Sequence, residues 1–329
     1  MKARIPILLL VALSAACAQS EPQTEETESP ELTSASPGLK APSGEAIVSL
    51  LGQPLEPPAL SEEFRVLQEG LLREARARLD EAPDEPESWI WVGRRTAYLA
   101  RYGEAIDVYT EAIERFPEEP RLYRHRGHRW ITTRQLDRAI EDLSRAADLI
   151  EGRPDRVEPD GLPNDRGIPT STLQSNIWYH LGLAHTLRGD FESALAAYEE
   201  CLAVSGNPDM LVATSYWLYL TQRRLGMDAE AAATLESITP ELEIIENADY
   251  HRLLLTYRRL ADAHELWEEA GADPAAVRYA TVAYGLGAYH LTDGRPEDAR
   301  EWFERAVESP TWAAFGYLAA EAELARWND

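Results

Sequence analysis

Residues 89–117 read WIWVGRRTAYLARYGEAIDVYTEAIERFP, a segment whose pattern recurs along the chain. Apolar and small residues recur at every third or fourth position through its first half and again through its second half, as they do on one face of a helix. Gly93 and Ala105 have almost no side chain, so two helices can approach closely while aromatic rings such as Tyr109 fill the space beside them. Pro117 lacks an amide hydrogen and disfavours helical backbone before it, which ends the second helix. The stretch therefore predicts a hairpin of two short helices.

The same spacing of aromatic, Gly and Ala residues recurs three more times along the chain. The further units lie within residues 123–146, 178–198 and 286–306. In its residue order and its period of about 34 positions, the pattern resembles the tetratricopeptide repeat, W-x2-L-G-x2-Y followed by A-x3-F, A and P. The resemblance implies an all-α fold, a right-handed superhelical solenoid of helix-turn-helix hairpins that stack on one another.

We expect this solenoid to span residues 61–329. Helical periodicity over residues 61–79 predicts a helix that caps the first repeat, and residues 312–327 supply a final helix as the other cap. Two weaker units, within residues 209–238 and 250–270, keep the periodicity without the full motif, so their register stays open. Asn207 and Pro208 have the character of an N-cap and a first-turn proline, which predicts that a helix begins there.

A loop insertion interrupts the repeats at residues 151–175. Its four prolines and three glycines exclude a helix across most of the segment. Long irregular loops are uncommon in compact domains and often carry function. Two interpretations stay open, a loop packed over the groove of the solenoid and a solvated excursion. The three aspartates of the loop lack the alternating spacing of a calcium-binding loop, so we expect no metal there.

The first sixteen residues have the pattern of a secretory signal peptide. Basic residues are followed by the apolar run 5–13 and then by small residues that end at Cys17. A cysteine in this place resembles the bacterial lipobox, in which the cysteine is lipidated. The lipobox usually has Leu where this chain has Ser14, so an ordinary cleavage after Ala18 also stays open. We expect a lipoprotein of the bacterial cell envelope, anchored at the outer membrane and facing the periplasm; the alternative is a soluble periplasmic protein.

Residues 17–60 are rich in Glu, Pro, Ser and Thr and have few large apolar residues. Such a segment cannot bury enough surface to offset its chain entropy, so it is expected to be a disordered tether behind the lipidated Cys17. Within it, the short apolar stretch from Ile47 to Leu55 is expected to dock on another part of the chain.

The composition favours a folded, acidic protein. Its hydrophobic content of 44% and its 9 Trp allow a sizeable core. The formal charge of −25, from 57 acidic against 32 basic residues, argues against a general binder of nucleic acids or anionic membranes. Cys201 has no partner for a disulfide once Cys17 is lipidated or removed, and it occupies a small-residue position of the third repeat, so we expect a buried apolar filler.

No catalytic motif is present in the sequence. It contains no H-E-x-x-H, no G-x-S-x-G, no phosphate-binding loop and no paired C-x-x-C, so we expect neither an enzyme nor a cofactor. His125 and His128 share a helix face but have no third ligand nearby, which argues against a zinc site. The alternative that stays open is a hydrolase or cell-envelope enzyme whose site is formed by the 151–175 loop and groove residues.

Positive charge is concentrated in one unit of this acidic chain. Residues 121–138 contain six Arg and two His, and Asp137 is the one acidic residue among them. The resemblance places the following residues in the concave groove: Arg94, Tyr98, Arg121, Arg124, His128, Asn176 and Tyr179. Guanidinium groups there could hold a carboxylate or phosphate with two hydrogen bonds. The other interpretation is that these arginines neutralise acidic faces close by.

The known carboxylate clamp of the family is not reproduced, since Ile90 and Arg94 stand where its first Lys and Asn would be. Specificity for an acidic peptide C-terminus therefore does not follow from the resemblance. We expect an exported, membrane-anchored scaffold that binds a partner protein or peptide, with anionic groups, in its concave groove. The lipid anchor would supply the membrane contact, and no nucleic-acid partner is expected.

Overall fold

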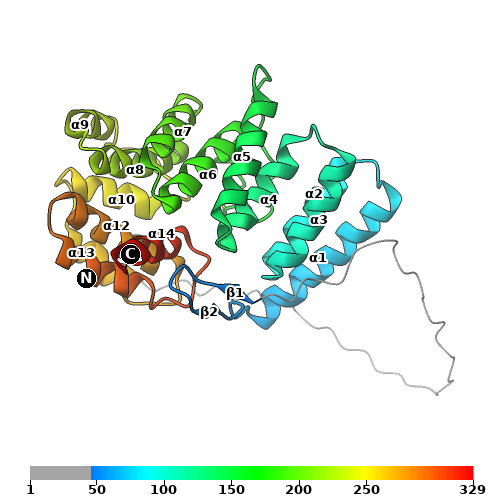
Figure 1. Cartoon of the computed structure of the whole chain (residues 1–329), viewed down its shortest axis with the longest axis horizontal. Helices are drawn as coiled ribbons and strands as arrows, with labels where there is room; N and C mark the ends of the chain where they lie inside the picture. Colours follow the sequence, from blue (N-terminus) through cyan, green and yellow to red (C-terminus); the bar gives the residue numbers. More distant parts are fainter. Residues whose placement is uncertain (1–45, 329) are drawn as a thin grey trace, which may run out of the picture. The chain divides into compact units, whose positions relative to one another are not determined.

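The computed structural model describes residues 46–328 (Figure 1). The predicted signal peptide, Cys17 and residues 17–45 of the predicted tether lie outside the described residues. The described part consists of fourteen helices and one short two-stranded hairpin, which confirms the all-α prediction. Within residues 46–328, no helix is both long enough and apolar enough to cross a bilayer.

Twelve of the helices form six consecutive hairpins, which confirms the predicted repeat architecture. The pairs are α2 (Pro86–Tyr98) with α3 (Tyr102–Arg115), α4 (Pro120–Thr132) with α5 (Leu136–Ile150), α6 (Leu173–Arg188) with α7 (Phe191–Ala203), α8 (Pro208–Arg224) with α9 (Asp228–Glu236), α10 (Ala248–Tyr257) with α11 (Ala263–Gly271), and α12 (Val277–Thr292) with α13 (Pro296–Ala306). Helix α1 (Glu62–Glu81) precedes them and packs on α2, and α14 (Phe315–Asn328) follows them.

A glycine allows the close crossing of the two helices in each clear repeat. A Cβ atom added to this glycine would lie within 2.3–2.7 Å of the side chain sixteen residues further along the chain. The four pairs are Gly93 with Tyr109, Gly127 with Leu143, Gly182 with Tyr198, and Gly287 with Phe303. The small residue of the motif is therefore required by direct contact with the large one.

Each hairpin turn contains one residue with left-handed backbone. The six residues are Ala100, Arg134, Gly189, Gly226, Arg259 and Gly294, with φ between 59° and 85°. In three of the turns this residue carries a side chain, although glycine adopts the conformation at lower cost. The turn geometry is thus maintained across the repeats even where the sequence does not supply glycine.

Two helices begin directly after a residue whose side chain caps them. Asn207 caps α8, because its side chain accepts a hydrogen bond from the amide of Met210 at 3.0 Å, and Pro208 follows at the first helical position. Ser61 caps α1 in the same way by accepting from Phe64 at 3.1 Å. The helices expected at these two places are confirmed.

The strands β1 (Ile47–Val48) and β2 (Pro54–Leu55) form an antiparallel hairpin. The hairpin segment contacts the C-terminal part of the chain, since the Leu50 amide donates to Glu321 at 3.0 Å. The Trp312 indole also donates to the carbonyl oxygen of Glu56 at 2.6 Å. The predicted docking of the stretch from Ile47 to Leu55 is seen in these contacts.

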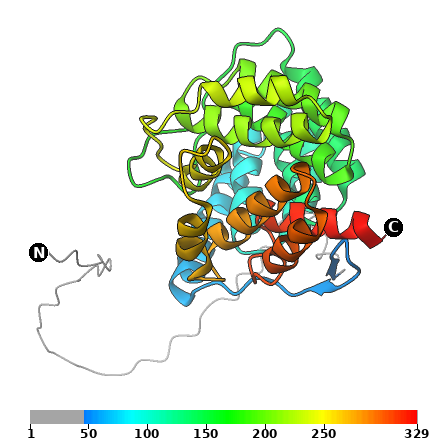
Figure 2. The same cartoon turned by 90° about the vertical axis from the view of Figure 1, so that its left-hand side faces the viewer.

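Helix α14 packs on α12 and α13, where the sequence places a cap, and it also turns back to contact α6 (Figures 1 and 2). The Arg326 guanidinium donates to the carbonyl oxygen of Leu187 at 3.0 Å. Residues 316–324 are buried without interruption, so α14 lacks the polar outer face expected of a terminal cap. The predicted final helix is therefore present and packs on the last repeat, and small side chains such as Ala319 and Ala320 let it also pack against other helices.

Candidate functional site

The predicted groove residues all lie on the first helices of the first three repeats. Arg94 and Tyr98 are on α2, Arg121, Arg124 and His128 are on α4, and Asn176 and Tyr179 are on α6. Four of them line one cavity of about 560 Å³: Arg124, His128, Asn176 and Tyr179. Arg94 lines a smaller cavity beside it, which also contains Arg124 and Asn176. The structure therefore brings together part of the predicted set.

The larger cavity has aromatic walls contributed by four helices. Besides His128 and Tyr179, the walls contain His180 from α6, Tyr250 from α10 and Phe315 from α14. Its volume falls in the range of roughly 300–1,000 Å³ that is typical of ligand pockets. Helix α14 supplies one wall, so the site is a cavity that is walled on several sides and open to solvent on another.

Two neutral histidines that line this cavity contact each other with tilted rings. The ring centroids of His128 and His180 are 4.3 Å apart, and Phe315 lies 5.5 Å from the first ring and 5.7 Å from the second. Burial, followed by the positive charge of Arg124, lowers the pKa of His180 to about 3. Burial also lowers the pKa of His128, with Arg129 adding to the effect. At neutral pH the pair is therefore uncharged.

A hydrogen bond fixes the tautomer of His180. Its Nδ1 lies 2.6 Å from the carbonyl oxygen of Asn176. This oxygen can only accept a hydrogen bond, so Nδ1 carries the hydrogen. The lone pair is then on Nε2, the nitrogen on the other side of the ring. His180 consequently offers a hydrogen-bond acceptor.

Tyr179 is part of the pocket wall and is not a free recognition group. Its hydroxyl accepts a hydrogen bond from the Trp217 indole at 2.7 Å and lies 3.5 Å from the Tyr250 hydroxyl. Only 8% of the residue is exposed. Tyr179 therefore has a structural role in the wall of the cavity.

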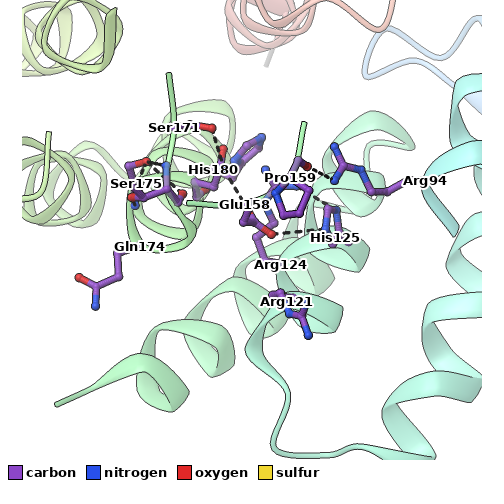
Figure 3. Close-up of polar contacts among 12 residues, drawn as sticks. Arg94, Arg121, Arg124, His125, Glu158, Pro159, Ser171, Gln174, Ser175 and His180 are labelled. Atoms are coloured by element: carbon purple, nitrogen blue, oxygen red, sulfur yellow. Dashed lines mark hydrogen bonds and ion pairs between the residues drawn. The ribbon is translucent and has the colours of Figure 1, made fainter. Parts of the chain in front are cut away.

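Arg121 lies outside both cavities and is neutralised by acidic neighbours. It pairs with Glu119 at 2.8 Å and also with Glu87. Figure 3 shows its side chain directed away from Glu158. Arg126 is similarly bound to Asp142 through two hydrogen bonds of 2.7 Å. For these arginines, the structure agrees with the interpretation that they neutralise nearby acidic residues.

The 151–175 loop lies against the first helices of three repeats, in agreement with the first of its two interpretations. Arg94 donates to the carbonyl oxygen of Pro159 at 2.5 Å (Figure 3). Glu158 approaches Arg124 to 3.3 Å and accepts from Asn176 at 2.9 Å. A Cβ on Gly161 would lie 2.3 Å from the Tyr98 hydroxyl, so the loop backbone closely contacts α2. The loop thus covers the predicted groove residues Arg94 and Tyr98.

Comparison with known families supports the repeat assignment. One sequence model described as a tetratricopeptide repeat matches residues 93–154 and 252–313, and a second one matches residues 175–208. The chain is a tetratricopeptide-repeat protein.

Curated and solved relatives of this tetratricopeptide-repeat protein are distant. The photosystem I assembly protein Ycf3 of Parasynechococcus marenigrum (strain WH8102) is 25% identical over 159 residues, which cover 47% of this chain and 76% of that protein. The crystal structure of YrrB, described as a TPR protein with an unusual peptide-binding site, is 14% identical, with a TM-score of 0.41, and covers 76% of this chain and 97% of its own. The crystal structure of MamA is 17% identical, with a TM-score of 0.40, and the match covers 54% of this chain and 90% of MamA.

Several site residues of this tetratricopeptide-repeat protein escaped sequence reasoning. His180 is one of them, because its ring partner is His128 on α4, in another repeat. Tyr250 enters the site from a distant repeat and Phe315 from α14, and the sequence pattern carries no signal for either. Among residues 46–328, no group of three or more His, Cys, Asp or Glu is arranged to hold a metal ion.

Cys201 has the structural role expected from its place in the repeat. It is fully buried, and its thiol lies 3.5 Å from the carbonyl oxygen of Ser175 and 3.2 Å from the Thr214 hydroxyl. Burial raises the pKa of this thiol to about 11, so the reactive thiolate is scarce at neutral pH.

Proposed function

We propose that this tetratricopeptide-repeat protein is a scaffold that binds a partner protein or peptide at the cavity between α4, α6, α10 and α14. The observation that carries the proposal is the cavity itself, about 560 Å³ in volume, whose walls contain His128, Tyr179 and His180 from first helices of the array. Repeat arrays bind partners on surfaces that the stacked units create together. Because the cavity is walled on several sides and open on another, a side chain or chain end of the partner can enter it while the rest lies outside.

The chemistry of the cavity favours an apolar or aromatic group bearing a hydrogen-bond donor. Its walls contain five aromatic or histidine rings, and the two contacting histidines are neutral, with His180 Nε2 as an acceptor. Two charged groups at its border, Arg278 and Asp249, pair with each other at 2.9 Å. Since Arg124 lies at the junction with the smaller cavity, an anionic group of the partner could bind there, next to the apolar group.

We further propose that the protein is exported and anchored by lipid at Cys17, on the periplasmic face of the outer membrane. The support is the signal-like pattern of residues 1–16 followed by the cysteine. Mass spectrometry of the mature N-terminus tests this part. A diacylglycerol-modified Cys17 is expected, and an unmodified start at Gln19 would contradict the anchor and leave a soluble periplasmic protein.

A substitution at the mouth of the cavity tests the scaffold function. Val277 lines the cavity and is 61% exposed, so Val277→Trp narrows the entrance without disturbing the core. Val66→Trp on α1 is a matched control, because Val66 is 55% exposed and lies outside the cavity. The two variants and the natural protein are used as baits on a cell-envelope fraction.

We expect a partner that the natural protein and Val66→Trp retain equally and that Val277→Trp retains at least tenfold less. Equal retention by both variants would show that the partner does not use the cavity. Incubation with cell-wall fragments separates the scaffold from an enzyme: stoichiometric binding without product is expected, and turnover would overturn the scaffold proposal.

A further inference from the structure

Glu158 is buried in a loop whose large apolar side chains lie open to solvent. The residue is 7% exposed, whereas its apolar loop neighbours Val157, Leu162 and Ile168 are 48–55% exposed. A loop held by apolar packing would bury those side chains first. The loop is therefore held by its polar contacts, and Glu158 is the central one.

Three side chains surround the Glu158 carboxylate. Its Oε2 lies 3.3 Å from Arg124 Nε and accepts from the Asn176 amide at 2.9 Å, and its Oε1 lies 3.6 Å from His125 Nε2 (Figure 3). His125 Nδ1 faces the Arg124 guanidinium at 2.9 Å and can only accept there, so the hydrogen of this imidazole is on Nε2. A guanidinium, an imidazole N–H and an amide N–H thus converge on one carboxylate.

The fit of Glu158 in this site is incomplete. Arg124 Nε and His125 Nε2 are both buried and have no hydrogen-bond partner of good geometry, although each faces the carboxylate. His125 as a whole is only 6% exposed. Buried donors without partners cost free energy, so a carboxylate that satisfied both would be held better than Glu158.

The residues after Glu158 lie along the repeats as a bound peptide would. The carbonyl oxygen of Pro159 accepts from Arg94 at 2.5 Å, and that of Gly161 accepts from Arg95 at 3.0 Å. Residues 158–161 therefore offer one side-chain carboxylate and two backbone carbonyls to α2, α4 and α6. These groups are general features of an acidic extended chain, so a segment of another protein could provide them too.

We propose that residues 155–161 are a tethered occupant of the groove, which an acidic extended segment of the partner displaces by placing its own carboxylate between Arg124 and His125. This inference rests on the proposed function, because Arg124 and Asn176 line both this site and the larger cavity. A segment bound in place of the loop would continue directly into the aromatic cavity.

The test uses the peptide acetyl-Val-Glu-Pro-Asp-Gly-amide, which copies residues 157–161, and a second peptide with Gln in place of Glu. Calorimetry measures their binding to the natural protein, to Glu158→Ala and to Asp165→Ala. Asp165 is the matched control, since it is an exposed carboxylate of the same loop. We expect Glu158→Ala to bind the Glu peptide at least tenfold more tightly than the other two proteins, and to bind the Gln peptide at least tenfold more weakly than the Glu peptide.

Equal affinity of all three proteins for the Glu peptide, or equal affinity of Glu158→Ala for both peptides, would overturn the inference. If Glu158→Ala does not fold, Glu158→Gln keeps the shape of the side chain, and the same order of affinities is expected for it. Adding Arg124→Ala to either Glu158 variant should abolish the gain in affinity for the Glu peptide. If the peptide experiment fails, the partner is still expected to be retained by Val66→Trp and lost from Val277→Trp. The two proposals can therefore fail separately.

Discussion

Arg134 and Glu321, 187 residues apart in sequence, form an ion pair in which Arg134 Nε donates to Glu321 at 3.0 Å. Their side chains are 3% and 0% exposed. Arg134 occupies the left-handed position of the α4–α5 turn, and its guanidinium also donates to the carbonyl oxygen of Trp312 at 2.9 Å. This pair attaches α14 to the second repeat and thereby holds Phe315 in the wall of the cavity.

Removing one partner of this pair should destabilise the fold strongly. Arg134→Ala leaves the Glu321 carboxylate buried without its cation, which typically costs about 3–5 kcal/mol of the free energy of unfolding. The double variant Arg134→Met with Glu321→Leu removes both charges and should be less destabilised than the single one. Urea denaturation of both variants tests this, and a loss below about 1 kcal/mol for Arg134→Ala would contradict it.

The glycine at the helix crossing should not tolerate a methyl group. A Cβ at Gly93 would lie 2.3 Å from the Tyr109 ring, so Gly93→Ala forces the helices of the first repeat apart and should cost about 1–3 kcal/mol. Gly206→Ala is the control, because a Cβ there meets no atom within 4 Å. Thermal unfolding measures both, and an equal midpoint for the two variants would show that the crossing is not as tight as described.

Two hairpin turns should respond to substitution in opposite directions. Arg259 is exposed and has a φ of 60°, which costs a residue with a side chain roughly 1 kcal/mol, so Arg259→Gly should stabilise the protein by somewhat less than that. Gly226 has a φ of 73° in the corresponding turn, and Gly226→Ala should destabilise by about 1 kcal/mol. Chemical denaturation gives both values. If both substitutions changed the stability in the same direction, the cost of a side chain at the left-handed position would not explain their effects.

Stability should decrease as the pH falls below neutrality. The pKa values of His125 and His180 are lowered to about 3 in the folded chain, whereas both histidines take up protons near pH 6.5 once the chain unfolds. The unfolded chain therefore binds more protons between these two values, and each histidine contributes a loss of up to about 1.4 kcal/mol per pH unit. Denaturation between pH 6.5 and 5 measures how the free energy of unfolding changes with pH. His180→Phe should reduce this slope by the contribution of one proton. A slope unchanged by this substitution would exclude a neutral His180.

The repeats could be predicted from the sequence because their requirements are local. A small residue such as Gly93 and its large partner Tyr109 lie sixteen positions apart within one hairpin, so the pattern records their contact directly. The same holds for the caps of α1 and α8. The hairpin order followed correctly from these signals.

The site could be predicted only in part because much of it depends on contacts between distant repeats. Nothing near Phe315 indicates that α14 turns back to stand beside His128, since that depends on how all the repeats stack. The loop contains several acidic residues, and the sequence does not distinguish Glu158, which is buried, from Asp160 and Asp165, which are exposed. Charge alone likewise could not separate Arg124, which lies in the site, from Arg121, which pairs with its neighbours.

Site-specific photocrosslinking tests most directly whether the cavity between α4, α6, α10 and α14 binds the partner. A photoreactive phenylalanine derivative is placed at position 277, at the mouth of the cavity, and in a second protein at position 66 on α1 as the matched exposed control. Both proteins are irradiated in cells that produce them from the full chain. We expect a discrete crosslinked partner from position 277 that is absent from position 66. Crosslinks of the same proteins from both positions, or none from position 277, would contradict binding at the cavity.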